Sequence, residues 1–250
     1  MDARANVTHY ERPDVVEDYA AFRGVGLLPR EARALERYFP STGRLLDLGC
    51  GAGRTTAALA ARGFDVVGLD VARPMVREVH DAVPAASAVA GDAALLPFAD
   101  DTFDGALFSY KGLDELRPSP ARAAALREIG RVLRPGAPLA FSAHNVLRHL
   151  VPYPPTQAAF ADRRQFWLAN VREGRLGTPE KRDVLSTEDE EPVHFGDPLS
   201  EYRRLRACGF DVRAFLPRDG PLSAFFGPTY FVVAVARGAR SPHPTPAAVT

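Results

Sequence analysis

The stretch that decides the fold reads Leu45-Leu46-Asp47-Leu48-Gly49-Cys50-Gly51-Ala52-Gly53-Arg54-Thr55-Thr56. A short apolar segment leads into a turn with glycine at every second position, and a helical pattern follows the turn. Glycine lets the backbone approach a ligand closely and take conformations closed to other residues. Open α/β sheets bind nucleotides at such a turn, at the carboxyl edge of the sheet. The stretch therefore predicts a nucleotide-like ligand at the end of a buried strand.

The spacing of the glycines argues against a dinucleotide. The dinucleotide fingerprint is G-x-G-x-x-G, and a match that starts at Gly49 needs a glycine where Arg54 stands. The motif here is D-x-G-x-G-x-G and starts with Asp47. A carboxylate at this point repels a pyrophosphate but suits a ligand with an ammonium group and no phosphate. The next predicted strand ends 23 residues later at Asp70, where an acid can accept hydrogen bonds from two ribose hydroxyls.

On both sides of this motif, short apolar segments bounded by turn residues alternate with segments of helical periodicity. This alternation predicts a doubly wound α/β fold, with a mostly parallel sheet covered by helices on both faces. Residues 146–196 interrupt it, and we expect a helical insertion there, without strands, over the carboxyl edge of the sheet. Strands are predicted at residues 44–48, 66–69, 86–90, 103–108, 138–142, 212–216 and 230–236. Four apolar sets have the spacing of one helix face: Leu28, Ala32, Leu35 and Phe39; Met75, Val76, Val79 and Val83; Leu126, Ile129 and Leu133; Leu199, Tyr202 and Leu205.

In these motifs the chain resembles the class I S-adenosylmethionine-dependent methyltransferases, especially the small-molecule type 11 methyltransferases. The resemblance covers about residues 43–145 and resumes at residues 202–237. It implies a Rossmann-like, seven-stranded, mostly parallel sheet with a helical insertion between strands five and six. The last strand, for which residues 230–236 are the candidate, is then antiparallel and lies between strands five and six. The motifs follow one another at residues 47–53, 68–70, 90–93, 96–98 with 103–107, and 126–136.

The resemblance also implies a cofactor, S-adenosyl-L-methionine. The first motif then holds the methionine moiety, Asp70 the ribose, and Asp92 with the Ala93 amide the adenine edge. Cys50 is expected as a small residue of the turn and not as a nucleophile. No metal is expected, because the six histidines show no metal-ligand spacing. The expected cofactor-binding residues are Tyr19, Asp47, Gly49, Cys50, Gly51, Gly53, Asp70, Val71, Asp92, Ala93 and Ser109.

The family motif carries over no fixed catalytic residue, because transfer from a sulfonium needs mainly orientation and the exclusion of water. Candidates stand after strands four and five, at Tyr110 and His144. An unperturbed histidine has a pKa of about 6.5, so His144 could accept a proton from the acceptor. Alternatively, its role is structural, as a histidine hydrogen-bonded at the end of a strand. Tyr110 could line the cofactor site or orient the acceptor. Alternatively, it is a partly buried tyrosine whose role is packing.

Five segments are expected along the chain. They are a helical arm over the cofactor (1–43), the cofactor-binding core (44–145), a helical lid and acceptor pocket (146–197), the end of the sheet (198–237) and a disordered tail (238–250). Tyr19 in the arm would place an aromatic face near the sulfonium, a role not expected of Tyr10. The aromatic residues of the insertion either line the acceptor pocket or pack the insertion onto the sheet: Tyr153, Phe160, Phe166, Trp167 and Phe195.

Composition and charge disfavour several classes of function. The 250 residues are 46% hydrophobic and 25% charged, as in soluble globular proteins. The 31 basic residues balance 31 acidic ones, which disfavours a nucleic acid or an anionic membrane as partner. Cys50 and Cys208 are too few for a disulfide framework, and residues 1–10 lack the apolar run of a signal peptide. We expect a cytoplasmic monomer or homodimer.

The predicted function is transfer of a methyl group to an O or N atom of a small molecule by in-line displacement. Only Lys111 and Lys181 are lysines, and with many alanines and prolines this is typical of a GC-rich genome and favours an acceptor from specialised metabolism. Three alternatives stay open. One is a non-catalytic protein that binds S-adenosylmethionine, and another is a nicotinamide-dependent oxidoreductase, which Arg54 disfavours. The third is a nucleic-acid or protein methyltransferase, which is disfavoured because residues 109–112 are not of the Asn-Pro-Pro-Tyr type.

Overall fold

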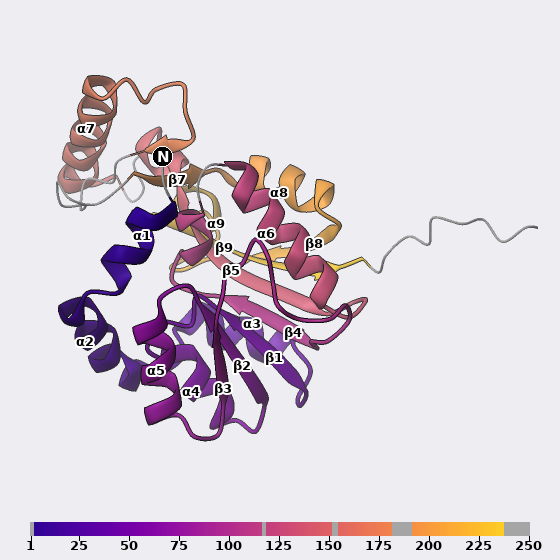
Figure 1. The fold of residues 1–250 in the computed structure, drawn as a ribbon. Helices are drawn as coiled ribbons and strands as arrows, with labels where there is room; N and C mark the ends of the chain where they lie inside the picture. The colour runs from indigo at the N-terminus through magenta and orange to yellow at the C-terminus, as the bar shows by residue number, and fades with distance from the viewer. Residues whose placement is uncertain (1–2, 117–118, 152–154, 182–191, 238–250) are drawn as a thin grey trace, which may run out of the picture.

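The computed structural model describes residues 3–116, 119–151, 155–181 and 192–237 of the chain. A twisted sheet runs through the middle of the molecule, and helices cover both of its faces (Figure 1). The predicted α/β class with a mostly parallel sheet is therefore confirmed. The tail at 238–250 and Tyr153 lie outside the described residues.

The parallel half of the sheet carries the glycine motif. Its strands lie in the order β3-β2-β1-β4-β5, and each pair is parallel. Because these strands run the same way, their carboxyl ends meet at one edge, where such sheets bind ligands. The strands are β1 (Arg44–Leu48), β2 (Asp65–Asp70), β3 (Ser87–Ala90), β4 (Gly105–Phe108) and β5 (Pro138–Asn145).

The other half of the sheet is antiparallel. Strand β9 (Thr229–Ala236) pairs antiparallel with β5 along Pro138–His144 and antiparallel with β8 (Phe210–Phe215) on its other side. The last strand thus lies between the fifth strand and its predecessor in the chain, and this prediction is confirmed.

The insertion is not purely helical, and here the prediction was wrong. It contains η3 (Val146–His149) and α7 (Gln157–Arg172), but also the strands β6 (Glu180–Lys181) and β7 (Val193–Gly196). These two strands pair antiparallel, and β7 extends the sheet at the carboxyl end of β5, where His144 lies opposite Phe195. The described residues thus form a nine-stranded sheet instead of a seven-stranded one. Strand β6 spans two residues and β7 four, too short to show a period of two in the sequence.

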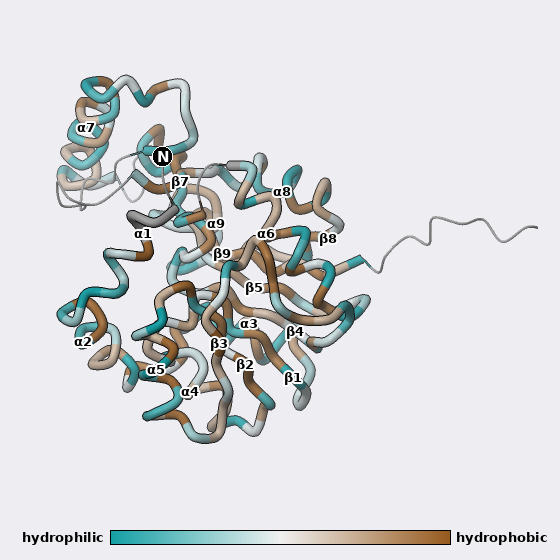
Figure 2. The backbone as a smooth tube through the Cα atoms, viewed as in Figure 1, coloured by the Kyte–Doolittle hydropathy of each residue, from teal (hydrophilic) through white to brown (hydrophobic). Residues whose placement is uncertain are grey.

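Apolar side chains fill the space on both faces of the sheet. On one face, Leu126 and Ile129 of α6 (Ser119–Val132) and Leu205 of α8 (Pro198–Ala207) are fully buried. The other face is covered by α3 (Pro29–Tyr38) and α4 (Arg54–Ala60), with α5 (Arg73–Ala82) packed beside β3. Figure 2 shows the brown, apolar strands inside this helical layer. No helix among the described residues is long and apolar enough to cross a membrane.

The faces predicted for α5 and α6 are buried, but the face predicted for α8 is not. Leu199 is 57% exposed and Tyr202 is 39% exposed, whereas Glu201 is fully buried beside Leu205. Glu201 is turned inward because it forms an ion pair with the buried Arg122 of α6, at 2.9 Å. Polarity alone places a glutamate on the solvent side, so the sequence pattern gave the wrong face.

Two helices at the N-terminus form an arm outside the helical layer, α1 (Ala3–Tyr10) and α2 (Pro13–Phe22). A single turn, η1 (Arg23–Val25), joins the arm to α3. Helix α2 contains no buried residue, so the half-buried side chains of Tyr10 and Tyr19 attach the arm to the body, against Ala52 and Met75.

Candidate functional site

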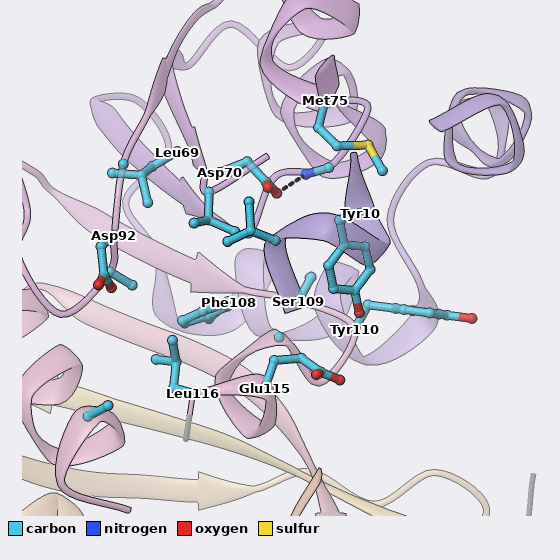
Figure 3. A pocket seen from close by; sticks show the side chains of 18 of the residues that line it. Tyr10, Leu69, Asp70, Met75, Asp92, Phe108, Ser109, Tyr110, Glu115 and Leu116 are labelled. Atoms are coloured by element: carbon cyan, nitrogen blue, oxygen red, sulfur yellow. Dashed lines mark hydrogen bonds between the residues drawn. The ribbon is translucent and has the colours of Figure 1, made fainter. Parts of the chain in front are cut away.

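A cavity of about 540 Å³ opens at the carboxyl ends of β1 to β4 (Figure 3). Its inner part is formed by the strand ends and the turns that follow them. Its outer part is formed by the arm, the single turn η2 (Gly112–Glu115), the start of α6 and the insertion. Of the site residues predicted from the sequence, those that line the cavity are Tyr19, Gly49, Gly51, Asp70, Val71, Asp92, Ala93, Ser109 and Tyr110.

The glycine turn needs glycine for both conformation and space. Gly49, Gly51 and Gly53 all have positive φ, at 58°, 52° and 91°. A Cβ on Gly51 would lie 3.1 Å from the Tyr19 ring, and a Cβ on Gly53 would lie 3.2 Å from Val79. The turn is therefore shaped so that the arm can lie directly on it.

Asp70 joins the end of β2 to this turn. Its carboxylate accepts hydrogen bonds from the Gly51 amide at 2.8 Å and from the Ala72 amide at 2.9 Å. Burial raises the pKa of Asp70, and these amides act in the opposite direction. Each oxygen of a carboxylate has two lone pairs, so each can still accept a hydrogen bond from a ligand.

The end of β3 supplies a second acid. Asp92 accepts a hydrogen bond from the Ala94 amide at 2.8 Å and faces the cavity beside Ala93. Leu69, Phe108 and Leu116 also line the cavity and give it an apolar stretch of wall (Figure 3). A flat ring with a polar edge matches such a wall.

Asp47, Cys50 and Gly53 do not line the cavity. Asp47 is buried and accepts a hydrogen bond from the Thr56 hydroxyl at 2.6 Å, while its Oδ1 atom has no partner among the described residues. Burial raises the pKa of Asp47 to about 7. Burial also raises the pKa of the Cys50 thiol, which packs against α5 and is not available as a thiolate. These three residues therefore support the glycine turn from the side that faces away from the cavity.

Both tyrosines of the arm reach the cavity. Their rings pack edge to face with centroids 6.0 Å apart, and burial raises the pKa of Tyr19 to about 12. Arg23 fixes the base of the arm, because it donates to the Ala52 carbonyl at 2.7 Å and to Glu78 at 2.9 Å. Tyr10, for which no such position was expected, lines the cavity as Tyr19 does. Tyr10 lies in α1 and Tyr19 in α2, so helical periodicity could not show that the two side chains reach the same cavity.

The turn after β4 is strained. Tyr110 and Lys111 are consecutive non-glycine residues with positive φ, at 53° and 69°, and such conformations concentrate at functional sites. The Tyr110 ring lines the cavity, is half exposed, and lies 5.7 Å from Phe22 of the arm.

His144 does not line the cavity. It is 6% exposed, its Nδ1 lies 2.9 Å from Asp114, and its backbone N–H donates to the same carboxylate at 2.6 Å. The Arg122 charge and the His144 hydrogen bonds overcome the effect of burial and lower the pKa of Asp114. His144 thus lies at the end of β5, behind η2 and outside the residues that line this cavity. A contact between His144 and the acceptor stays a prediction.

Ser109 has a structural partner as well as a place in the cavity wall. Its hydroxyl donates to Glu31 at 2.6 Å, and Arg54 donates two hydrogen bonds of 2.8 Å to the same carboxylate. The Leu28 amide donates to it at 2.7 Å. Glu31 therefore joins the end of β4, the glycine-turn helix and α3.

The outer part of the cavity was largely missed. Of the insertion's aromatic residues, Phe166, Phe195 and Trp167 form a small core of their own, and Phe160 is 52% exposed. The insertion instead contributes short or charged residues that have no periodicity and no motif. The residues of the outer part are Val7, Tyr10, Gly112, Glu115, Ala121, Arg175, Thr178, Glu180 and Pro192. The described residues contain no group of His, Cys, Asp and Glu side chains that could hold a metal ion.

Comparisons with known proteins show similarity over part of the chain. Residues 45–136 match the family described as "Methyltransferase domain". The chain is 37% identical to a demethylmenaquinone methyltransferase of Beutenbergia cavernae over 57% of this chain and 56% of that protein. It is 42% identical to the protein of that name from Corynebacterium kroppenstedtii, over 46% of this chain and 48% of that protein. The chain thus spans about half the length of these curated relatives.

A solved structure shows the same fold. It is a crystal structure of a SAM-dependent methyltransferase from Methanosarcina mazei, with a TM-score of 0.67, 22% identity, and coverage of 85% of this chain and 99% of that one. At this identity the likeness concerns the fold alone. Residues 45–136, which contain the glycine turn and the strand ends, thus match a methyltransferase domain, on a fold that the chain shares with this solved structure.

Proposed function

We propose that the chain transfers a methyl group from S-adenosylmethionine to an O or N atom of a small molecule. The observation that carries this proposal is the single cavity into which the glycine turn, Asp70, Asp92 and the arm tyrosines all face. Cofactor residues and a site for a second molecule are then contiguous, as a direct transfer requires.

The residues present fit S-adenosylmethionine better than a nicotinamide dinucleotide. The polar groups of the inner part are carboxylates and backbone amides, and Arg175 of the outer part is the only cation among the described lining residues. A pyrophosphate would face Asp70 without a compensating charge. We assign the ribose hydroxyls to Asp70, the adenine edge to Asp92 and Ala93, and the methionine moiety to the glycine turn.

The chain's own contribution is to orient two molecules and exclude water. When bound, the cofactor supplies a methyl group already activated as a sulfonium. Tyr19 lies on the glycine turn and Tyr110 in the turn after β4, so their rings limit the positions open to an acceptor. The arm and the insertion together close the outer part, and we propose that they act as the lid.

The acceptor is a small molecule held in the outer part of the cavity. Two relatives are named demethylmenaquinone methyltransferase, and the apolar and aromatic wall supports an acceptor with a ring. An acceptor from specialised metabolism remains our proposal, as does a monomeric or homodimeric state.

Transfer of label tests the proposal. The purified chain is incubated with S-adenosylmethionine labelled in the methyl group and with a panel of phenols, alcohols and ring-bearing amines. The proposal expects labelled product from at least one class, and loss of that product in Asp70→Ala but not in Asp65→Ala at the exposed start of the same strand. Binding of the cofactor without label transfer to any acceptor would favour the non-catalytic alternative.

A further inference from the structure

Four hydrogen bonds meet at the buried carboxylate of Glu31 in α3. Its Oε1 atom accepts from the Ser109 hydroxyl at 2.6 Å and from Arg54 at 2.8 Å. Its Oε2 atom accepts from Arg54 at 2.8 Å and from the Leu28 amide at 2.7 Å. Each carboxylate oxygen has two lone pairs, so these contacts use its full capacity as an acceptor. Glu31 is 2% exposed and stands outside the residues that line the cavity, so it acts on a bound molecule only through its neighbours.

Two of these neighbours lead to the strained turn after β4. Ser109 starts the turn, and its hydroxyl joins it directly to Glu31. The guanidinium of Arg54 lies 5.8 Å from the centre of the Phe22 ring, and that ring lies 5.7 Å from the Tyr110 ring. The contacts thus form a closed path from Ser109 through Glu31, Arg54 and Phe22 to Tyr110, which follows Ser109 in the chain.

The turn needs support because its backbone is strained. Tyr110 and Lys111 both have positive φ, and such conformations persist only where the surrounding structure holds them. The Ser142 hydroxyl of β5 accepts a hydrogen bond from the Lys111 amide at 3.0 Å, and a second contact joins Ser109 to Glu31. Ser109 and Tyr110 both line the cavity, so the conformation held in this way shapes the site itself (Figure 3).

We propose that Glu31 is a positioning residue for the cavity. It holds Ser109 directly, and through Arg54 and Phe22 it holds the Tyr110 ring, so that both side chains line the site. The inference rests on the proposed methyltransferase function and adds to it a residue that lies outside the glycine turn and the strand ends. Glu31 and Ser109 are 78 positions apart in the chain, so no local pattern reveals the link.

A role in folding alone is the alternative. Glu31 lies in the first turn of α3 and accepts from the amide that precedes the helix, a contact that stabilises a helix start. Such a role changes the free energy of unfolding but leaves the Tyr110 ring and the affinity for ligands as they are. Measurements at these two points therefore separate the alternatives.

A pair of variants interrupts the path at different points. Ser109→Ala removes only the hydroxyl that joins the turn to Glu31, which keeps its ion pair with Arg54, so this variant leaves no buried charge without its partner. Glu31→Gln replaces the carboxylate by an amide of the same shape. Glu36→Gln, at an exposed position of the same helix, is the matched control. A double variant that combines Ser109→Ala and Glu31→Gln shows whether the two residues act together.

The first measurement needs no ligand. The chain is labelled with 3-fluorotyrosine, its fluorine NMR spectrum is recorded, and Tyr110→Phe identifies the Tyr110 resonance. We expect this resonance to shift or broaden in Ser109→Ala and in Glu31→Gln, and to stay in place in Glu36→Gln. The resonance of Tyr202 on α8, identified in the same way, should stay in place in all of them. A Tyr110 resonance that does not move in Ser109→Ala overturns the inference, even if Glu31→Gln does not fold.

The second measurement is calorimetric titration with S-adenosylhomocysteine. We expect Ser109→Ala and Glu31→Gln each to weaken its binding by about fivefold, the contribution of one hydrogen bond, and the double variant to weaken it no further. Glu36→Gln should bind it as the unmodified chain does. Unchanged affinity in both single variants, or losses that multiply in the double variant, would overturn the inference. Failure of S-adenosylhomocysteine to bind the unmodified chain would instead contradict the proposed function, and the Tyr110 resonance would still decide whether Glu31 positions the turn.

Discussion

Replacing Arg122 with methionine tests how the wall of the cavity is held in place. Arg122 is fully buried and donates to Asp114 at 2.6 Å, to the Leu113 carbonyl at 2.8 Å and to Glu201 at 2.9 Å. Tyr230 of β9 donates to Glu201 as well, at 3.1 Å. The guanidinium therefore joins η2, α6 and α8 behind the cavity.

The expected loss follows from the two carboxylates left behind. Asp114 and Glu201 are both fully buried, so Arg122→Met removes the buried charge that they share. Glu201 then keeps only the partly exposed Arg204, at 3.2 Å, and Asp114 keeps His144, at 2.9 Å. Breaking a buried ion pair in this way costs about 3–5 kcal/mol of the free energy of unfolding. For a chain of this size that corresponds to a fall in Tm of roughly 6–20 °C. Adding Glu201→Gln should recover part of the loss, because it removes one of the stranded charges.

Arg206→Met is the matched control. Arg206 is half exposed on α8, and its nearest acid, Asp211, lies 3.5 Å away. An exposed pair of this kind contributes about 0–1 kcal/mol. Thermal unfolding followed by circular dichroism measures both variants. If Arg122→Met lowers Tm no more than Arg206→Met does, the reasoning about buried charge is wrong.

Three further predictions concern the glycine turn and two buried titrating groups. Gly51→Ala and Gly63→Ala both place a side chain at positive φ, so each should lower the free energy of unfolding by about 1–2 kcal/mol. Only the Cβ of Gly51→Ala would meet the Tyr19 ring, at 3.1 Å. That variant alone should therefore also weaken S-adenosylhomocysteine binding, by about tenfold or more in calorimetry. Burial lowers the pKa of His194 from 6.5 to about 3, so between these pH values the unfolded chain binds a proton that the native imidazole does not. The free energy of unfolding should therefore fall as pH falls from 6.5 toward 3. Urea unfolding of His194→Gln should lack this part of the pH dependence. Burial raises the pKa of Asp47 from 3.8 to about 7, so the native carboxyl holds a proton that the unfolded chain releases; Asp47→Asn should therefore gain stability over the unmodified chain progressively between pH 4 and pH 7, and a constant difference across that range would contradict the assignment.

The parts of the fold that depend on local patterns could be predicted from the sequence. The turn at Gly49 to Gly53 and the strand that ends at Asp70 are each determined by a few neighbouring residues, so the sequence reveals both. In the structure the Gly51 amide donates to the Asp70 carboxylate at 2.8 Å. The apolar period of α5 and α6 likewise reports which side of each helix is buried, because those apolar side chains pack directly against the sheet and its neighbours.

The parts that depend on distant partners could not be predicted. Glu201 faces inward only because Arg122, 79 positions away in the chain, meets it there. His144 is directed away from the cavity by Asp114 on one side and the Phe195 ring, 4.7 Å away, on the other. The outer part of the cavity is assembled from four separate segments, and no single segment contains a motif.

The assignment of the inner part of the cavity to S-adenosylmethionine can be tested by a calorimetric titration. S-adenosylmethionine, S-adenosylhomocysteine and NAD are titrated calorimetrically into the unmodified chain, into Asp70→Ala and into Asp65→Ala. We expect saturable binding of the first two ligands, its loss in Asp70→Ala, its retention in Asp65→Ala, and no heat from NAD. Binding of NAD alone, or S-adenosylmethionine binding that is unchanged in Asp70→Ala, would contradict the assignment of this site to S-adenosylmethionine.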